Sequence, residues 1–357
     1  NDSSDTGKLI GRDGKPLVPE TFSTMVTGRL VYTFSLCHAL GGGASCLDAA
    51  THGLNVLLGP ACRPDGGFAH TLASDGSIAD AHGDLYDIAF VQLALGGYAA
   101  VSGRQDILGT ADAIGARLDR DPSGGFREAG QASGLRLQYP EMHLFEAFQL
   151  LARIAPGRGW EARADALADL AERRLLQPEG CINEWYDGTW NAAEADGEPE
   201  RELGHQFEWA WLLYRYGLTS GASRATALAD RLYAYGKSVV ATTVGASIGP
   251  LPNRIDKTGR ARDALRPLWP LTELLRAACL APPEKANGEI AAAAVKTIFT
   301  HYMDCESGLW INTLNAEDTP DDRTVPSRLL YHIVPALITF SRDRTKVSSV
   351  SSPIFDR

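Results

Sequence analysis

A repeated unit of two helices and a glycine-containing turn limits the folds open to this chain. Turn glycines stand at Gly67, Gly125, Gly180 and Gly308, with successive spacings of 58, 55 and 128 residues, the last being about two repeats of 64. The segments between these turns carry apolar residues at helical spacing. Self-similarity at a fixed period is the signature of a repeat architecture. We therefore expect a helix pair followed by a turn, six times around the molecule.

Apolar periodicity predicts eleven helices. Glycine and proline mark several of their ends, as at 41–43 and 59–60. The dipeptide Asp75-Gly76 predicts a short hairpin between two of the helices. The helices are expected at residues 24–40, 46–58, 84–101, 105–118, 142–154, 160–176, 205–216, 223–239, 269–280, 285–302 and 328–340.

These helices are rich in Ala and Leu on more than one side, so they need neighbours on both sides. Strands and helices do not alternate along the chain, which argues against a doubly wound sheet or a β/α barrel. We predict an all-α fold, an (α/α)6 barrel of six helix hairpins with short turn or hairpin insertions at the mouth of its pocket. An open α-solenoid is the alternative, but its capping repeats should be more polar. The barrel is expected over residues 24–340, after a lead-in segment (1–23) and before a polar tail (341–357).

Composition narrows the kinds of partner. The chain has 357 residues, 44% of them apolar, and a net charge of −10, so no basic surface points to nucleic acid or an anionic membrane. No apolar run approaches the roughly 20 residues of a membrane span. None of the six cysteines forms a Cys-x-x-Cys pair, and we interpret them as small buried hydrophobes of a reduced, cytoplasmic protein. A small-molecule ligand is expected, and a homodimer stays open.

Four polar aromatic or histidine residues hold similar positions in the repeat. Each falls near the beginning of the helix that follows a turn, and in a closed ring these helices are equivalent. Equivalent positions in a ring converge on one mouth, so we expect the histidines to face a common pocket. Counted from the preceding turn glycine, Tyr86 lies at 19, His143 at 18, His205 at 25 and His332 at 24 residues.

Helical spacing also supplies partners for these residues. Arg29 has the same isolated polar character, because it stands in the apolar run Arg29-Leu30-Val31-Tyr32. The pairs expected on one helix face are His143 with Glu146, His205 with Glu208, Trp269 with Glu273, and Arg328 with His332.

Structural roles without chemistry explain the same residues in another way. His205 could belong to a helix-capping turn with a surface ion pair, and His143 could be a satisfied core histidine. Arg29 and Glu273 could form ion pairs between helices. The two His-x-x-Glu pairs invite a dimetal site, but bundle dimetal sites use the reverse order with further bridging carboxylates, so we expect no metal.

Six motifs, in this order, resemble the N-acylglucosamine 2-epimerase superfamily, which includes mannose isomerases, sulfoquinovose isomerase and cellobiose 2-epimerases. The resemblance covers about residues 24–340 and is specific at superfamily level. The motifs are Arg-Leu-Val-Tyr-Thr-Phe (29–34), Asp-Leu-Tyr-Asp-Ile-Ala-Phe (84–90), Met-His-Leu-Phe-Glu-Ala-Phe (142–148), Gly-His-Gln-Phe-Glu-Trp-Ala-Trp-Leu-Leu (204–213), Leu-Trp-Pro-Leu-Thr-Glu (268–273) and Tyr-His-Ile (331–333).

The resemblance implies metal- and cofactor-independent proton transfer at C1 and C2 of an open-chain aldose. It makes His205 and His332 the acid–base pair, with Glu208 orienting or tuning His205 and Arg29 binding the C2 or carbonyl oxygen. It also implies that the remaining site residues contact the sugar. These are His143, Trp269 and Glu273, which would hold the sugar and help to open its ring, and Tyr86, in the second motif. Arg328 departs from the family pattern, and this second cation could bind a phosphate, a sulfonate or a hydroxyl of the substrate, or pair with a carboxylate.

The residue types fit this chemistry on their own terms. Removing a proton next to a carbonyl needs a base with a pKa near neutral, as histidine has, and the enediolate needs a fixed cation at its oxygen, which Arg29 can supply. We predict an aldose–ketose isomerase of the mannose/fructose type, because Tyr331-His332 and the Trp-Pro-x-Thr-Glu helix resemble that branch. Alternatives are a 2-epimerase of N-acylglucosamine or a related aldose, a glycoside hydrolase, and a catalytically silent binding barrel.

Overall fold

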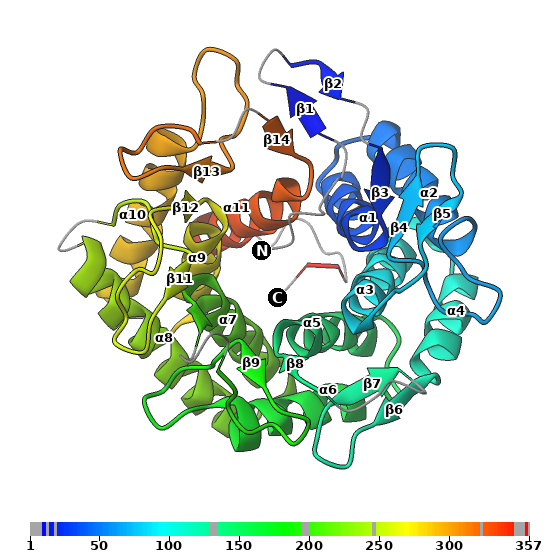
Figure 1. Cartoon of the computed structure of the whole chain (residues 1–357), viewed down its shortest axis with the longest axis horizontal. Helices are drawn as coiled ribbons and strands as arrows, with labels where there is room; N and C mark the ends of the chain where they lie inside the picture. The colour runs from blue at the N-terminus through cyan, green and yellow to red at the C-terminus, as the bar shows by residue number, and fades with distance from the viewer. Residues whose placement is uncertain are drawn as a thin grey trace.

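The helices form a closed double ring (Figure 1). The computed structural model describes residues 9–11, 14–17, 20–128, 134–194, 200–244, 248–321, 324–345 and 354–355. The inner helices are α1 (Thr24–Ala39), α3 (Leu85–Ser102), α5 (Tyr139–Ile154), α7 (Leu203–Ser220), α9 (Trp269–Leu280) and α11 (Leu329–Thr345). The outer helices are α2 (Ala44–Leu58), α4 (Asp106–Gly115), α6 (Trp160–Leu170) with its π-helical continuation η1 (Ala171–Leu175), α8 (Ser223–Val244) and α10 (Lys285–His301).

The predicted all-α barrel is confirmed, with one detail left open. Each of the first five inner helices is followed along the chain by an outer helix that packs against it. The last inner helix, α11, packs between α9 and α1 and so completes the ring. An outer partner for α11 is not among the described residues, so the sixth complete hairpin stays a prediction.

Burial explains which helices lie inside. Nearly every residue of α3 is buried, whereas α2 buries only Ala50, Leu54 and Leu57, on one face. A helix that is apolar all round needs neighbours on every side, and an amphipathic helix needs them on one. By length and composition α3 could also span a membrane, but 78% of that stretch is buried inside the barrel. It is the kind of helix that the centre of such a ring requires.

Local sequence sets where the first inner helices begin. The Ser23 side chain caps α1 by accepting a hydrogen bond from the Val26 amide, and Asp84 and Asp87 form a capping box at the start of α3. Gly28 then allows α1 and α3 to approach closely, because a Cβ there would lie 2.6 Å from the carbonyl oxygen of Phe90. This contact brings the first turns of the two helices side by side.

Short antiparallel strands form a collar at the end of the barrel where the inner helices begin. Several two-stranded sheets join the turn of one repeat to the turn of the next. The predicted hairpin at Asp75-Gly76 is confirmed, since β4 and β5 flank it. The strands are β1 (Leu9–Gly11), β2 (Pro16–Leu17), β3 (Thr21–Ser23), β4 (Thr71–Ala73), β5 (Ile78–Asp80), β6 (Leu118–Arg120), β7 (Phe126–Glu128), β8 (Arg136–Leu137), β9 (Trp185–Tyr186), β10 (Arg201–Glu202), β11 (Arg254–Ile255), β12 (Arg266–Pro267), β13 (Thr313–Leu314) and β14 (Thr324–Pro326).

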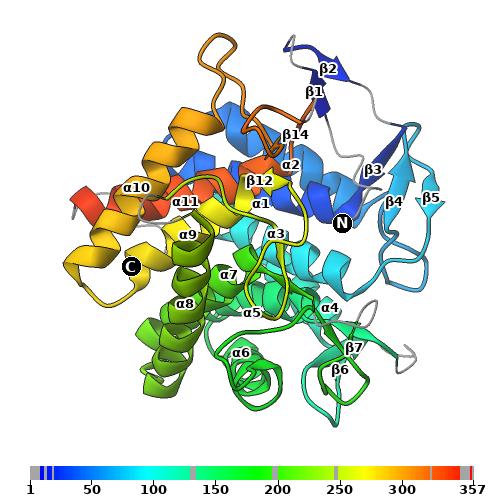
Figure 2. The ribbon, with the colours of Figure 1, turned by 60° about the vertical axis from the view of Figure 1, so that its left-hand side comes forward.

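Described residues near both ends of the chain, from the predicted lead-in and tail, pack against the barrel. Strand β1 pairs with β14 and β3 pairs with β4, so the described residues before α1 belong to the collar (Figure 2). Near the other terminus, Ile354 and Phe355 are buried in a cluster that contains Leu36, Leu93 and Leu150. Those leucines lie in the later turns of inner helices, so this dipeptide packs at the end of the barrel opposite the collar. Residues 1–8, 245–247 and 346–353, from the predicted lead-in, a loop and the tail, lie outside the described residues.

The cysteines differ partly from their predicted role as buried hydrophobes. All six are free, and only Cys181 is fully buried. Cys62 and Cys305 are exposed because they lie in turns between helices rather than on apolar helix faces. The others, Cys37, Cys46 and Cys279, are half-buried.

Candidate active site

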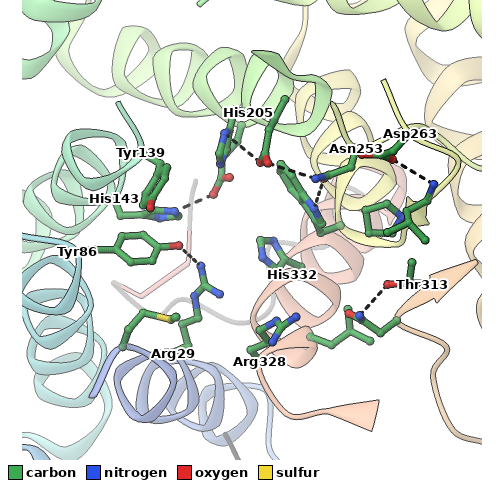
Figure 3. A pocket seen from close by; sticks show the side chains of 18 residues that line it. Arg29, Tyr86, Tyr139, His143, His205, Asn253, Asp263, Thr313, Arg328 and His332 are labelled. Atoms are coloured by element: carbon green, nitrogen blue, oxygen red, sulfur yellow. Dashed lines mark hydrogen bonds and ion pairs between the residues drawn. The ribbon is translucent and has the colours of Figure 1, made fainter. Parts of the chain in front are cut away.

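A cavity of about 250 Å³ opens at the collar end of the barrel (Figure 3). All six inner helices contribute to its wall, through Met25, Arg29, Tyr86, Tyr139, His143, His205, Glu208, Trp269, Leu329 and His332. The collar and loops add Glu202, Asn253, Asp263, Leu265, Pro267, Asn312, Thr313 and Arg328.

Eight of the nine residues singled out from the sequence lie on this wall: Arg29, Tyr86, His143, His205, Glu208, Trp269, Arg328 and His332. The ninth, Glu273, does not. Its side chain is fully buried behind His332 and is bonded there to protein groups rather than facing the cavity. A direct contact between Glu273 and a sugar is therefore not what the geometry favours. Its place is that of a partner to a site histidine.

His205 is held by two carboxylates. Its Nδ1 lies 2.9 Å from Glu184 Oε2 and 3.5 Å from Glu202 Oε2. Its ring packs between those of Tyr139 and Trp269, with centroids 5.8 and 5.0 Å away. With Nδ1 occupied by Glu184, the other ring nitrogen, Nε2, is the one available to a ligand.

These carboxylates set the charge of His205. Burial lowers the pKa of the imidazole, but the charge and hydrogen bond of Glu184, with the charges of Glu202 and Glu208, raise the pKa to about 9. His205 is therefore an imidazolium at neutral pH. Burial raises the pKa of Glu202 itself to about 7, although His205 opposes this.

His332 has a similar hydrogen bond and the opposite charge state. Its Nδ1 lies 2.9 Å from Glu273 Oε1. Burial lowers the pKa of His332 to about 4, since the nearby cations Arg29 and Arg276 offset the effect of Glu273. At neutral pH the ring is neutral and donates its Nδ1 proton to Glu273, which leaves a lone pair on Nε2.

Beneath the cavity, Arg276 contributes to this difference, together with Arg29. The guanidinium is fully buried, lies 2.9 Å from Glu273 Oε2 and 3.4 Å from Glu146 Oε1, and stacks over the Trp211 ring at 3.4 Å. A buried cation with two carboxylate partners neutralises much of their field. The negative charge that Glu273 presents to His332 is therefore weaker than the charge that Glu184 presents to His205.

The third histidine, His143, belongs to the same buried network. Its Nδ1 lies 3.5 Å from Glu146 Oε2 and 3.9 Å from Glu208 Oε1. Burial lowers its pKa to about 4 despite the Glu146 hydrogen bond. Burial, together with the charges of Glu273 and Glu146, raises the pKa of Glu208 well above its usual range. This favours the neutral carboxylic acid, a form that can donate a hydrogen bond into the cavity.

Arg29 lies on an aromatic platform at the opposite wall from α7 (Figure 3). Its Nη2 donates to the Tyr86 hydroxyl at 2.7 Å. The guanidinium lies 4.5 Å from the Phe90 ring centroid and 4.9 Å from that of Tyr331. Rings on several sides restrict the side chain and keep its charge close to the cavity. A cation so held can stabilise a negative oxygen of a bound molecule.

The segment 253–266 carries five cations, so the sequence alone leaves open whether it is an anion clamp at the mouth or a solvated loop. In the structure the segment reaches the mouth and supplies Asn253, Asp263 and Leu265 to the cavity wall. Two of its cations pair with carboxylates: Arg254 Nε lies 2.9 Å from Asp263 Oδ2, and Arg266 pairs with Asp318. An amide, an acidic and an apolar side chain, rather than a set of arginines, line the cavity from this segment.

Two groups of side chains are close enough to hold a metal, each with its ligand atoms within 4.8 Å of one another: Glu184, Glu202 and His205, and His143, Glu146 and Glu208. In the first group, His205 and neighbouring amide groups already hydrogen-bond Glu184. In the second, Tyr331 and Arg276 bind Glu146. Arg276 also makes a cation unfavourable beside Glu146.

Three residues of the site escaped sequence reasoning. Glu202 gave a weak signal, because it precedes His205 by three residues on the same helix face. Arg276 stands three residues after Glu273, a spacing that suggests an ion pair and no more. Glu184 gave none: it lies 21 residues before His205, in the loop that leads into β9.

Taken together, fold and site define a helical barrel with three histidines and an arginine around a small polar cavity. The chain matches the family model of N-acylglucosamine 2-epimerase (GlcNAc 2-epimerase) over residues 7–336. It is 30% identical to a mannose-6-phosphate isomerase of Rhizobium meliloti (strain 1021), over 92% of this chain and 88% of that protein. The chain therefore belongs to the N-acylglucosamine 2-epimerase family, and it is an isomerase or epimerase.

Solved structures share the fold. A D-mannose isomerase superposes with a TM-score of 0.83 at 21% identity, over 96% of this chain and 93% of that one. A cellobiose 2-epimerase from Bacillus thermoamylovorans B4167 superposes with a TM-score of 0.80 at 16% identity, over 94% and 93% of the two chains. At these identities the likeness concerns architecture. Choosing between the two reactions requires the site itself.

Proposed function

We propose that this protein interconverts an aldose and its 2-ketose, of the mannose/fructose type, through an enediol and without a metal or an organic cofactor. The observation that carries the proposal is the pair of cavity histidines with opposite charge states. Groups whose environments separate their pKa values are natural acid and base partners. His332, neutral at neutral pH, is the base, and His205, protonated, is the acid.

The reaction then runs as two proton exchanges. Nε2 of His332 takes the C2 proton, the C–H electrons form the C1–C2 double bond, and the carbonyl oxygen O1 takes a proton from Nε2 of His205. In the second half, O2 returns a proton to His205 as its carbonyl forms, and His332 delivers its proton to C1. Arg29 stabilises the negative charge that develops on the oxygens. At the end both histidines have regained their starting charge states.

Opening of the sugar ring must come first, since aldoses are mostly cyclic in water. Ring opening needs a proton donor at the ring oxygen and an acceptor at the O1 hydroxyl. The neutral form favoured for Glu208 suits the donor, and neutral His143, 3.9 Å from it, suits the acceptor. Trp269 offers an apolar face for the sugar to pack on.

A 2-epimerase is the second candidate, because the same histidines could return the proton to the opposite face of C2. The charge states argue against it. Epimerisation leaves His332 protonated and His205 neutral after each turnover, which is the unfavourable arrangement for both. The glycoside hydrolase alternative needs two carboxylates flanking the substrate. Of the pair that the sequence suggests for it, Glu208 and Glu273, only Glu208 lies on the cavity wall.

Incubation with mannose in heavy water, followed by NMR, tests the proposal. Formation of fructose is expected, with deuterium at C1 to the extent that the proton on His332 exchanges with heavy water before it is delivered, and chelator treatment should leave the rate unchanged. Glucose labelled only at C2 would establish epimerisation instead. Arg29→Met should lower kcat by about 10²–10³-fold if the guanidinium stabilises the enediolate, and a release of reducing sugar from oligosaccharides would revive the hydrolase alternative.

A further inference from the structure

Glu184 is a buried glutamate on the loop that precedes β9, and its carboxylate contacts His205 and two residues beside it, Gln138 and Glu202. The side chain is 4% exposed. Oε2 accepts hydrogen bonds from His205 Nδ1 at 2.9 Å and from Gln138 Nε2 at 3.0 Å, and Oε1 accepts one from the Glu202 amide at 3.1 Å. The carboxylate is thus fixed at both oxygens.

Hydrogen bonds among buried residues hold the Glu184 carboxylate in place. The Gln138 side chain also accepts the indole N–H of Trp209, a fully buried residue of α7. The backbone N–H of Gln138 donates a hydrogen bond to the backbone carbonyl oxygen of Glu184 at 3.1 Å, so the two residues are joined through main chain as well as side chain. Loop, α5 and α7 therefore hold the carboxylate in one position relative to the His205 ring.

The partners of Glu184 differ in charge from those of Glu273. Besides His205, Glu184 is bonded by a neutral amide group and a backbone N–H. Glu273 is bonded by the guanidinium of Arg276 as well as by His332. A carboxylate whose other partners are neutral directs its full charge at the imidazole, and a carboxylate paired with a guanidinium does not.

We propose that Glu184 is a positioning residue of the reaction: it directs Nε2 of His205 toward the sugar and keeps that histidine in its protonated, proton-donating form. This rests on the proposed isomerase function. Other titratable groups also face His205, namely Glu202 from the start of α7, Glu208 from the next turn and His143 from α5. Glu184 makes the shortest of these contacts and is the strongest of the carboxylates that favour the charged ring.

Replacement of Glu184 by glutamine tests the inference, because it keeps the size and shape of the side chain and removes the charge, while one of the two acceptor oxygens becomes an NH2 group. In Glu184→Gln the basic limb of the kcat/KM profile should move down from about pH 9 by about 1–3 pH units. The acid limb, set by His332, should stay near pH 4. A shift of two pH units leaves about a tenth of His205 protonated at pH 8, so the rate should fall about tenfold there and recover near pH 5. Recovery at low pH separates an electrostatic role from a structural one.

Glu141→Gln is the matched control. Glu141 is also a buried glutamate bonded to a backbone amide, but it lines a different cavity and pairs with Arg136. Its replacement should leave both limbs of the profile in place. A basic limb that moves equally in both variants would overturn the assignment to Glu184.

A measurement without turnover keeps the inference apart from the proposed function. Histidine ¹⁵N NMR, assigned with a His205→Gln variant, should show His205 still protonated at pH 8 in the wild type and titrating at lower pH in Glu184→Gln. Absence of turnover on every aldose would defeat the isomerase proposal and leave this titration readable. A wild-type His205 that titrates near pH 6.5 overturns the inference, and this result does not depend on whether Glu184→Gln folds. An unchanged pKa of His205 in a folded Glu184→Gln protein overturns it as well.

Discussion

The variant Arg276→Met tests whether one buried guanidinium causes the difference in pKa between His205 and His332. Arg276 is fully buried and is the cation that pairs with both Glu273 and Glu146. Methionine retains an apolar contact with the Trp211 ring but leaves two buried carboxylates without this partner. Breaking a buried ion pair by removing one member costs about 3–5 kcal/mol. We expect a loss of unfolding free energy of that size at pH 7.

The same variant should change the pH profile in a defined direction. Arg276 lowers the pKa of Glu273 and, through its positive charge, that of His332. Without it, the Glu273 charge acts undiminished on His332, so the pKa of His332 rises from about 4. Because His332 must be neutral to act as base, the acid limb of kcat/KM should move to higher pH by about one pH unit or more.

Urea unfolding followed by circular dichroism and a pH–rate series measure the two effects. Arg224→Met is the control, since Arg224 pairs with Asp169 on the surface with nearly half of its side chain exposed. Exposed pairs are worth about 1 kcal/mol or less, so little change is expected in either measurement. A stability of Arg276→Met within about 1 kcal/mol of the wild type, with an acid limb still near pH 4, would refute the reasoning.

Three further predictions follow from pKa values and glycine positions. The wild-type kcat/KM should be flat between about pH 4, where His332 becomes protonated, and about pH 9, where His205 loses its proton; a single limb near pH 6.5 in the pH–rate profile would contradict this. Gly204→Ala places a Cβ 2.0 Å from Trp269 Cζ3, so we expect kcat/KM to fall by about 10²-fold with unchanged helix content by circular dichroism. Gly109→Ala, with nothing within 4 Å of the new Cβ, should raise the unfolding free energy by about 0.4–1 kcal/mol and leave the kinetics unaltered; destabilisation in urea would count against it.

The helices were predictable from the sequence, whereas of the collar only the hairpin at Asp75-Gly76 was. The predicted helix at 269–280 coincides with α9, because the apolar residues of this single segment recur at helical spacing. The helix expected at 105–118 ends at Gly115, since residues 118–120 pair as β6 with β7. Strands of two or three residues carry no periodic pattern. Their pairing depends on a distant segment, as Arg201 depends on Ile255.

The positions of the site histidines were predictable from the sequence, and their protonation states were not. The repeat register brought the histidines to one end of a ring, because equivalent positions in successive repeats share a place in space. The hydrogen bonds that set their protonation join segments far apart along the chain. Glu184 precedes His205 by 21 residues and Glu273 precedes His332 by 59. Burial and partner charge, which decide a pKa, are properties of the packed structure and leave no local signal in the sequence.

The difference in pKa between His205 and His332 also bears on which reaction the site favours. With pKa values of about 9 for His205 and about 4 for His332, exchanging their protonation states costs on the order of 7 kcal/mol. Isomerisation exchanges them only within a turnover, because each histidine gives and takes one proton at carbon or at oxygen. Epimerisation at C2 ends each turnover in the exchanged state and must restore it through solvent. The weakened charge of Glu273 beside Arg276 and the full charge of Glu184 beside neutral partners therefore support the proposed transfer of a proton from C2 to C1 over transfer across C2.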